Sequence, residues 1–470
     1  MRGTDQLASV TALTRYYDEI QCALRLVGAR HRATTFDPGF TLPVMDARMA
    51  EFLAPSRMRL VELEPYRDRR LLLLDLMGNP RTRTTKTFAS LVIVARAVRH
   101  IQDTGQPIVI LTPTSANKGT ALRDAVLRAI TCGLVTPDQL RIVTVAPAGS
   151  LPKLWSGGLD EDPDLAARNP VALYHGRDAA GVKELVRWYM ETCAPELERT
   201  GVRVWHTMAL DNYRTGDVAR ACFENEFAPP DPAVPRLHAH AVSSAFGLLG
   251  HNLGRELVAT PGSPPSRYLL VQHLHTPDMV LSLYTDGVRD EDRPRYTRDP
   301  ATGLYHQSAN DHFPRVTADP YERLDSTFYT RRPATSAEMN ALIRRQGGGG
   351  IVVSGHECAQ RHPEILGRLL SAGVPFPDHF DDLRERSLSM AMTGVLNGID
   401  RGVVREPEVL VHGSGSYSRD DFRPLPMART TPVRTMDDLA DVLRRMPRGG
   451  AGGDSVHAAE RDGSVVARTR

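Results

Sequence analysis

The stretch RLLLLDLMGNPRTRTTKTFASLVIVARAVRH, residues Arg70 to His100, joins three different sequence patterns. It begins with a short, continuous apolar run, continues through a turn containing glycine, asparagine and proline, and ends with the apolar spacing of a helix. A buried strand, a loop and a helix in this order are typical of parallel α/β sheets. The threonine-rich loop puts Lys86 at the mouth of a helix that we expect to begin near Thr87.

Short apolar, β-branched runs continue to alternate with helical patterns along the chain. Apolar strands separated by helices predict an α/β protein. We expect two lobes, each an open, mostly parallel sheet flanked by helices. Residues 6–28 and 44–62 have apolar positions at helical spacing, so a helical N-terminal extension is predicted over residues 1–65.

The remaining chain divides by composition into two predicted lobes and a tail. The large lobe is predicted over residues 66–99 and 216–447, with an insertion at about 284–335 where charged, proline-containing sequence interrupts the alternation. A small, mobile lobe is predicted over residues 100–215. Residues 448–470 are rich in glycine and charge, which predicts disorder.

Overall composition excludes several classes of protein. The 470 residues carry 58 Lys and Arg against 56 Asp and Glu, a formal charge of +2, so no nucleic-acid or membrane partner is expected. No apolar stretch approaches the roughly 20 residues needed to cross a bilayer, and the first residues contain no apolar signal core. Five scattered cysteines do not form a disulfide framework, which favours a cytoplasmic location.

Lysine is scarce in this chain. Only Lys86, Lys118, Lys153 and Lys183 occur, while arginine supplies every other basic side chain. Arginine can replace lysine on a solvated surface, but not where an amine must lose its proton and attack a carbonyl. The positive end of a helix dipole would favour the neutral form of Lys86. A reactive amine is therefore predicted at Lys86, although an ordinary surface lysine would also fit the pattern.

Three further strand-to-helix loops carry polar or small residues where α/β sheets bind ligands. In PTSANKGTALRDA, Thr114, Ser115 and Asn117 could bind a carboxylate or phosphate, or could simply cap the helix. The small residues of SSAFGLLG, which begins at Ser243, suit either a phosphate or close packing of the helix on the sheet. A late strand, EVLVHGSGSYS, leads into a glycine–serine turn.

In this order the four loops resemble those of the pyridoxal-phosphate (PLP) enzymes of the tryptophan-synthase β-subunit superfamily, known as fold type II, which includes threonine synthase and cysteine synthase. The resemblance covers roughly residues 70–420. NPRTRTTKTFAS is similar to the family's NPTGSxKxR segment, and PTSANKGTALRDA is similar to its TSGNxGxALA loop. Asp211 to Phe227, DNYRTGDVARACFENEF, resembles the Asn-x-x-Arg-x-x-Gly segment that precedes the phosphate turn.

The resemblance implies a role for each of these loops. Lys86 would form the internal aldimine with PLP and act as the base at the substrate Cα. Asn117 would hydrogen-bond the 3′-oxygen of the cofactor and, with Thr114 and Ser115, bind the substrate carboxylate. His412 or Ser414 would face the pyridine nitrogen. The implied phosphate site comprises Ser243, Ser244, Ala245, Phe246 and Gly247.

The resemblance further implies a homodimer that catalyses β- or γ-elimination or replacement on a serine or homoserine derivative carrying a leaving group. This sequence departs from the family pattern in two places. SSAFGLLG replaces the glycine-rich GxGGxxxG phosphate loop, and Thr87 and Phe88 stand where an arginine or aspartate is usual. These departures leave open a catalytically silent relative that acts as a binding protein.

Several histidines lie close enough together in the sequence to suggest metal ligands. His356 and His362 flank Cys358, and two His-x-His pairs begin at His238 and His273. Zinc needs four ligands in suitable geometry. Alternation within an apolar strand puts both members of a pair on one face, as expected of histidines that line a cofactor or the core. No metal site is predicted.

Overall fold

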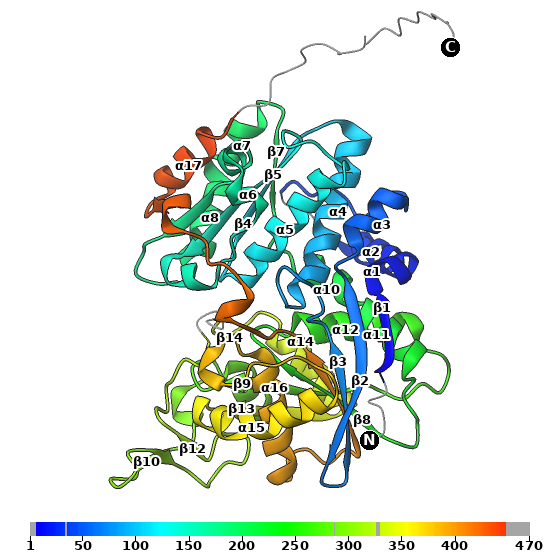
Figure 1. Cartoon of the computed structure of the whole chain (residues 1–470), viewed down its shortest axis with the longest axis vertical. Coiled ribbons are helices and arrows are strands. Elements are labelled where there is room, and N and C mark those ends of the chain that lie inside the picture. Colours follow the sequence, from blue (N-terminus) through cyan, green and yellow to red (C-terminus); the bar gives the residue numbers. More distant parts are fainter. Residues whose placement is uncertain (1–5, 33–34, 180, 286, 326–329, 448–470) are drawn as a thin grey trace, which may run out of the picture.

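The computed structural model describes residues 6–32, 35–179, 181–285, 287–325 and 330–447. The predicted disordered tail, residues 448–470, lies outside the described residues. The protein is an α/β protein with two main sheets, each mostly or wholly parallel and flanked by helices, which confirms the predicted fold class (Figure 1). Among the described residues, no helix combines the length and apolar character needed to cross a membrane.

The larger sheet has seven strands. Its last five strands pair in parallel, whereas β1 and β2 add an antiparallel edge. In spatial order the strands are β1 (Gln6–Thr11), β2 (Arg57–Tyr66), β3 (Arg69–Asp75), β15 (Glu408–Gly413), β8 (Arg236–Ala241), β9 (Arg267–His273) and β13 (Gly348–Val353).

The smaller sheet has five strands, all parallel. In spatial order they are β17 (Thr431–Val433), β6 (Val171–Tyr174), β5 (Leu140–Pro147), β4 (Ile108–Pro113) and β7 (Arg203–His206). The edge strand β17 and the following helix α17 (Met436–Arg444) return to this sheet from the C-terminal part of the chain. Placing all of residues 216–447 in the large lobe is therefore wrong for this last segment.

The N-terminal residues are not wholly helical, contrary to the prediction. Helices α1 (Ala12–Arg15), α2 (Tyr17–Arg30) and α3 (Ala47–Leu53) do form, but strands β1 and β2 flank them. The buried positions of β2 include Met58, Leu60 and Leu63. In so short a segment these positions fit a helical spacing as well as a partly alternating one. This segment forms a strand because it pairs with β3.

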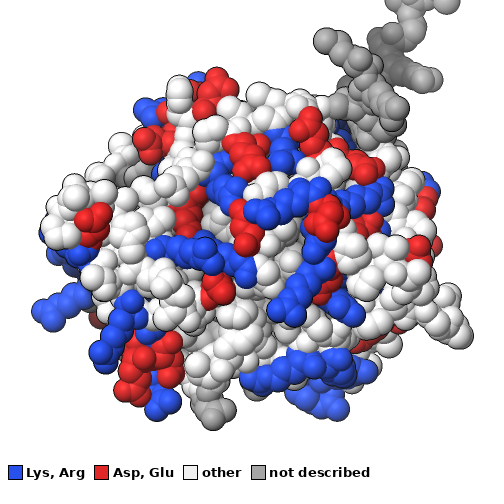
Figure 2. All heavy atoms as spheres, turned by 90° about the horizontal axis from the view of Figure 1, so that it is seen from below, with Lys and Arg blue, Asp and Glu red and all other residues white. Residues whose placement is uncertain are grey.

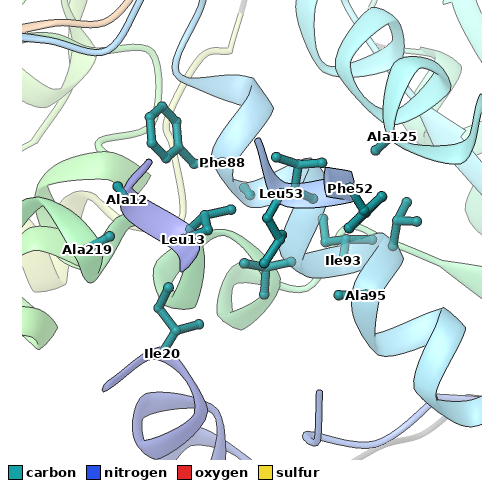
Figure 3. Close-up of a cluster of buried hydrophobic side chains, with 14 of the residues drawn as sticks. Ala12, Leu13, Ile20, Phe52, Leu53, Phe88, Ile93, Ala95, Ala125 and Ala219 are labelled. Carbon is teal, nitrogen blue, oxygen red and sulfur yellow. The ribbon is translucent and has the colours of Figure 1, made fainter. Parts of the chain in front are cut away.

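The core lies between the sheets and their covering helices. Helix α4 (Lys86–Thr104) is buried along most of its length and belongs to one apolar cluster with residues of both sheets, including Leu72 and Ile110. Figure 3 shows Phe88, Ile93 and other side chains of this cluster meeting those of the N-terminal helices. Since α4 starts at Lys86, this packing fixes the position of the lysine backbone.

Other helices complete the layers. Helices α15 (Gly355–Ser371) and α16 (Ser387–Asp400) cover the opposite face of the seven-stranded sheet, and α8 (Gly181–Thr192) and α17 cover that of the five-stranded sheet. The remaining helices are α5 (Asn117–Thr131), α6 (Gly158–Glu161), α7 (Pro163–Arg168), α9 (Ala194–Glu198), α10 (Leu210–Asp217), α11 (Ala219–Phe227), α12 (Phe246–Val258), α13 (Asp278–Tyr284) and α14 (Ser336–Gln346).

Two small sheets complete the secondary structure. A three-stranded antiparallel sheet, β10 (Thr297–Arg298), β11 (Tyr305–His306) and β12 (Val316–Thr317), lies within the predicted insertion. Strands β14 (Leu383–Glu385) and β16 (Tyr417–Ser418) pair with each other. On the face seen in Figure 2, basic and acidic side chains are interspersed, as the near-neutral composition predicts.

Candidate active site

The four loops that the sequence singles out all contribute residues to the wall of one pocket. It is lined by residues that follow the carboxyl ends of β3, β8 and β15 in the larger sheet and of β4 and β7 in the smaller sheet. Ligands of open α/β proteins bind at this edge of a sheet. All the predicted site residues line the pocket except His412.

Lys86 is the first residue of α4 and is half-buried in the pocket wall. Burial lowers the pKa of its amine, and the positive charge of Arg220 lowers it further, while Asp217 and Glu385 act in the opposite direction. A larger fraction of the amine is therefore neutral at a given pH than for a solvated lysine, as a nucleophile requires.

Hydrogen bonds hold the loop before Lys86 together and attach it to the glycine–serine turn. Asn79 binds the loop from within, because its side-chain nitrogen donates to the Thr84 carbonyl at 3.1 Å and its oxygen accepts from the Thr82 backbone N–H at 3.0 Å. The backbone N–H of Thr85 donates to the Ser414 carbonyl at 2.8 Å. The lysine and the serine turn are thus held together by the backbone.

Ser414 and His412, the two alternatives for a ring-nitrogen partner, lie in different places. Ser414 lines the pocket, and its buried hydroxyl has no hydrogen-bond partner among the described residues. His412 is fully buried behind the pocket wall, with Nε2 3.2 Å from Nδ1 of His238 and Nδ1 3.3 Å from a nitrogen of Arg220. Only Ser414 of the two can reach a ligand in the pocket.

The turn before α12 is tightly constrained at Ala245 and Gly247. Ala245 has φ of 52°, a left-handed conformation that glycine adopts at least cost. Gly247 has no room for a side chain, because an added Cβ would lie 2.7 Å from a nitrogen of Arg220 and 2.8 Å from a ring carbon of His240. The turn is followed by the first N–H groups of α12, which have no acceptor within the helix. Such groups suit an anion.

The loop after β4 combines a structural cap with polar groups that face the pocket. The Thr114 hydroxyl accepts from the backbone N–H groups of Ala116 at 3.1 Å and Gly119 at 2.9 Å, so it shapes the loop itself. Asn117 donates from its side chain to Glu385 and accepts from the Tyr417 hydroxyl at 2.8 Å. An amide nitrogen carries two N–H groups, so one remains for a ligand.

Several lining residues were not singled out by sequence reasoning. Glu385 lies in a charged segment that reads as solvated surface, yet it is buried and contacts Asn117, Lys153 and Ser387. Lys118 and Lys183 also line the pocket. The scarcity of lysine in the sequence, which indicates a function for Lys86, is a signal for these two lysines as well.

Behind the pocket lies a network of buried imidazoles. One nitrogen atom each of His238, His251 and His412 lies within 4.8 Å of the others. Nε2 of His251 lies 2.8 Å from Glu224, which also pairs with Arg236. Burial lowers the pKa of all three histidines, which favours their neutral form. His412 hydrogen-bonds His238 and Arg220, whereas His251 hydrogen-bonds Glu224 and the Tyr268 hydroxyl. His240, on the same face of β8 as His238, lines the pocket instead.

A family model matches residues 8–447. The chain belongs to DUF6002, a family of unknown function. No curated protein matches this DUF6002 chain.

Solved structures similar to the DUF6002 chain include a threonine synthase from Brucella melitensis with bound PLP, at 11% identity and a TM-score of 0.49, covering 93% of this chain and 84% of that one. An L-serine ammonia-lyase from Rhizomucor miehei matches at 12% identity and a TM-score of 0.46, covering 75% and 90%. A threonine deaminase isoform from Solanum lycopersicum matches at 11% and 0.44, covering 91% and 88%. At these identities and TM-scores, the matches do not indicate a function for the DUF6002 chain. Its function has to be inferred from the residues of its own site.

Proposed function

We propose that the chain is a PLP-dependent enzyme that catalyses β- or γ-elimination or replacement on an amino acid with a leaving group on its side chain. The observation that carries the proposal is the convergence of four strand-end loops on one pocket, with the amine of Lys86 inside it. The lowered pKa of this amine and the unpartnered hydroxyl of Ser414 both fit the cofactor.

Each part of PLP has a matching group in the pocket. Lys86 would carry the cofactor covalently, and the turn from Ser243 to Gly247 would hold its phosphate with backbone N–H groups and serine hydroxyls. Asn117 would donate its second N–H to the ring oxygen, and Ser414 would bind the ring nitrogen. A neutral serine favours an unprotonated ring nitrogen, and hence elimination or replacement over transamination.

PLP, when bound, supplies an electron-withdrawing ring that accepts negative charge from the substrate Cα. The chain's own groups do the rest. The loop at Thr114 and Ser115 binds the substrate carboxylate, and the amine of Lys86 removes the proton from Cα once it is released from the cofactor. The surrounding buried side chains keep water away from the reacting carbon.

Borohydride reduction followed by peptide mass spectrometry tests the proposal. The expected result is a cofactor-sized mass increment on the peptide that contains Lys86, together with loss of the violet absorption band. With four lysines in the chain, the assignment is unambiguous. A Lys86→Ala variant should lose both signals, and the peptides that contain the other three lysines, which should stay unmodified, are the internal control in the same digest. Unmodified protein after incubation with PLP would refute the proposal.

Substrate esters distinguish the two chemistries. Incubation with O-acetyl and O-phospho esters of serine should release pyruvate and ammonia in a β-elimination. The homoserine esters should release 2-oxobutyrate and ammonia in a γ-elimination. The homodimer also remains a prediction, which light scattering on the purified protein can check.

A further inference from the structure

We propose that a second pocket, on the other side of the loop that carries Lys86, binds a small oxyanion, a phosphate or carboxylate compound, and that its occupancy is coupled to the position of Lys86. The inference goes beyond the proposed function, because it adds a regulatory site to the chain and does not depend on the cofactor. The second pocket has a volume of about 600 Å³. Sites for small molecules usually measure roughly 300–1,000 Å³.

The loop before Lys86 and the glycine–serine turn form a wall that the two pockets share. Thr85, Lys86 and Ser414 line the pocket of the proposed active site, whereas Arg83 and Ser416 line the second pocket. Two backbone hydrogen bonds join the loop to the turn. The N–H of Thr85 donates to the Ser414 carbonyl at 2.8 Å, and the N–H of Ser416 donates to the Arg83 carbonyl at 3.3 Å. A ligand that contacts Arg83 therefore acts on a segment that ends at Lys86, three residues later.

The second pocket is basic. Its lining includes the four arginines Arg57, Arg59, Arg83 and Arg128, and a single acidic side chain among the described residues, that of Asp75. The planar guanidinium group can bind a carboxylate or a phosphate through two parallel hydrogen bonds. An oxyanion is therefore the class of ligand that this lining favours.

Part of the polar lining has no partner within the protein. The exposed guanidinium of Arg57 forms no ion pair or hydrogen bond with any described residue. Each of the other three arginines has one acidic partner within 3.0 Å, which occupies only part of its five N–H groups. The buried hydroxyl of Ser416 also has no hydrogen-bond partner in the described part of the chain. Arg57 and Ser416 thus both lack the polar partner that an oxyanion would supply.

The backbone of Arg83 provides the coupling between the two pockets. Its φ is 45°, a left-handed conformation that a residue other than glycine adopts at a cost in free energy. The ion pair of Arg83 with Asp421, at 2.6 Å, favours this conformation. An oxyanion that contacts the same guanidinium from the second pocket would favour it further. Occupancy of the second pocket should therefore make opening of the Lys86 loop less frequent.

Isothermal titration calorimetry of the full-length protein as purified tests binding, with inorganic phosphate and citrate as the probes at constant ionic strength. Wild type should bind at least one of the two. Arg57→Gln should bind it at least about tenfold more weakly, the effect of losing one charged hydrogen bond. Arg25→Gln is the matched control and should bind like wild type, because Arg25 is an exposed arginine of α2 that does not line the second pocket.

Two results of the calorimetry would overturn the proposal. One is the absence of binding of either probe to wild type, and the other is equal affinity in Arg57→Gln and wild type. Comparing phosphate with citrate shows which oxyanion the site prefers.

Hydrogen–deuterium exchange followed by mass spectrometry tests the coupling in the same samples. A saturating concentration of the bound probe should slow exchange at least about threefold in the peptides that contain Thr85 and Ser416, whose N–H groups join the loop to the turn. The same concentration should have no such effect in Arg57→Gln.

The exchange experiment also detects binding in the wrong place. An anion in the pocket of the proposed active site would slow exchange equally in wild type and in Arg57→Gln, which would overturn the proposal, as would unchanged exchange in wild type. Neither measurement involves PLP. A failure here is therefore distinct from a failure of Lys86 to carry the cofactor.

Discussion

Lys153 and Asp325 form a buried ion pair, with the lysine Nζ 2.9 Å from each carboxylate oxygen and side-chain exposures of 8% and 1%. Lys153 follows β5 of the five-stranded sheet, and the same ammonium reaches Glu385 of β14 in the pocket wall. Glu385 in turn accepts from Asn117. The pair therefore joins the loops of the smaller sheet to the wall that faces them.

Replacing Lys153 with methionine should lower the free energy of unfolding by about 3–5 kcal/mol, because it leaves two buried carboxylates without their cation. Urea denaturation of wild type and variant at pH 7.5 measures the difference. Lys118→Met is the matched control, since it removes a pocket lysine that has no carboxylate partner, and it should not destabilise the protein. Equal stability of Lys153→Met and wild type would contradict the structure at this point.

The low pKa of Lys118 predicts how stability changes with pH. An unfolded lysine has a pKa near 10.4, whereas that of folded Lys118 is about 7. Between these values the unfolded chain binds the additional proton, so Lys118 makes the free energy of unfolding rise with pH. Relative to Lys118→Met, wild type should therefore gain stability from about pH 7 towards pH 10. Parallel pH profiles of the two proteins in urea denaturation would show that the amine is not perturbed.

Ser414→Ala should weaken PLP binding roughly three- to tenfold, the value of one hydrogen bond, and change stability little, because the hydroxyl has no partner in the protein. Ser416→Ala is a close control. Its hydroxyl is also buried and unpartnered, but it does not line the pocket. Titration of each apoprotein with PLP, followed by absorbance, gives the affinities. The assignment of the ring-nitrogen partner to Ser414 fails if both variants bind PLP equally well.

The sequence was most informative where each segment's own residues determine its structure. The apolar run before Lys86 and the helix after it could be predicted because packing against one sheet leaves a clear pattern. The edge strand Thr431–Val433 could not, since three residues carry no usable periodicity and their partner, β6, lies more than 200 residues earlier in the chain.

The site, too, was predictable only where a segment's own residues determine the outcome. The residue types of the four loops indicated which segments meet, but not which side chain reaches the pocket. His412 and Ser414 lie two residues apart, and the end of β15 at Gly413 leaves one behind the wall and the other in front. Glu385 could not be predicted, because its burial depends on Lys153 and Asn117 from distant parts of the chain.

Gly247→Ala should lower PLP affinity more than any change of the turn's hydroxyls, and the reason is steric. The new Cβ would lie 2.7 Å from Arg220 and 2.8 Å from His240. Arg220 cannot move freely, since it donates to the Thr85 hydroxyl at 2.6 Å and pairs with Asp217. The turn must therefore shift away from the sheet, which misplaces the N–H groups at the start of α12.

Gly367→Ala is the control, because Gly367 also lies within a helix and an added Cβ there meets nothing within 4 Å. That variant should gain about 0.5–1 kcal/mol of stability and keep wild-type PLP affinity. Absorbance titrations with PLP, alongside urea denaturation, separate the two effects, and normal PLP affinity in Gly247→Ala would remove the phosphate from this turn.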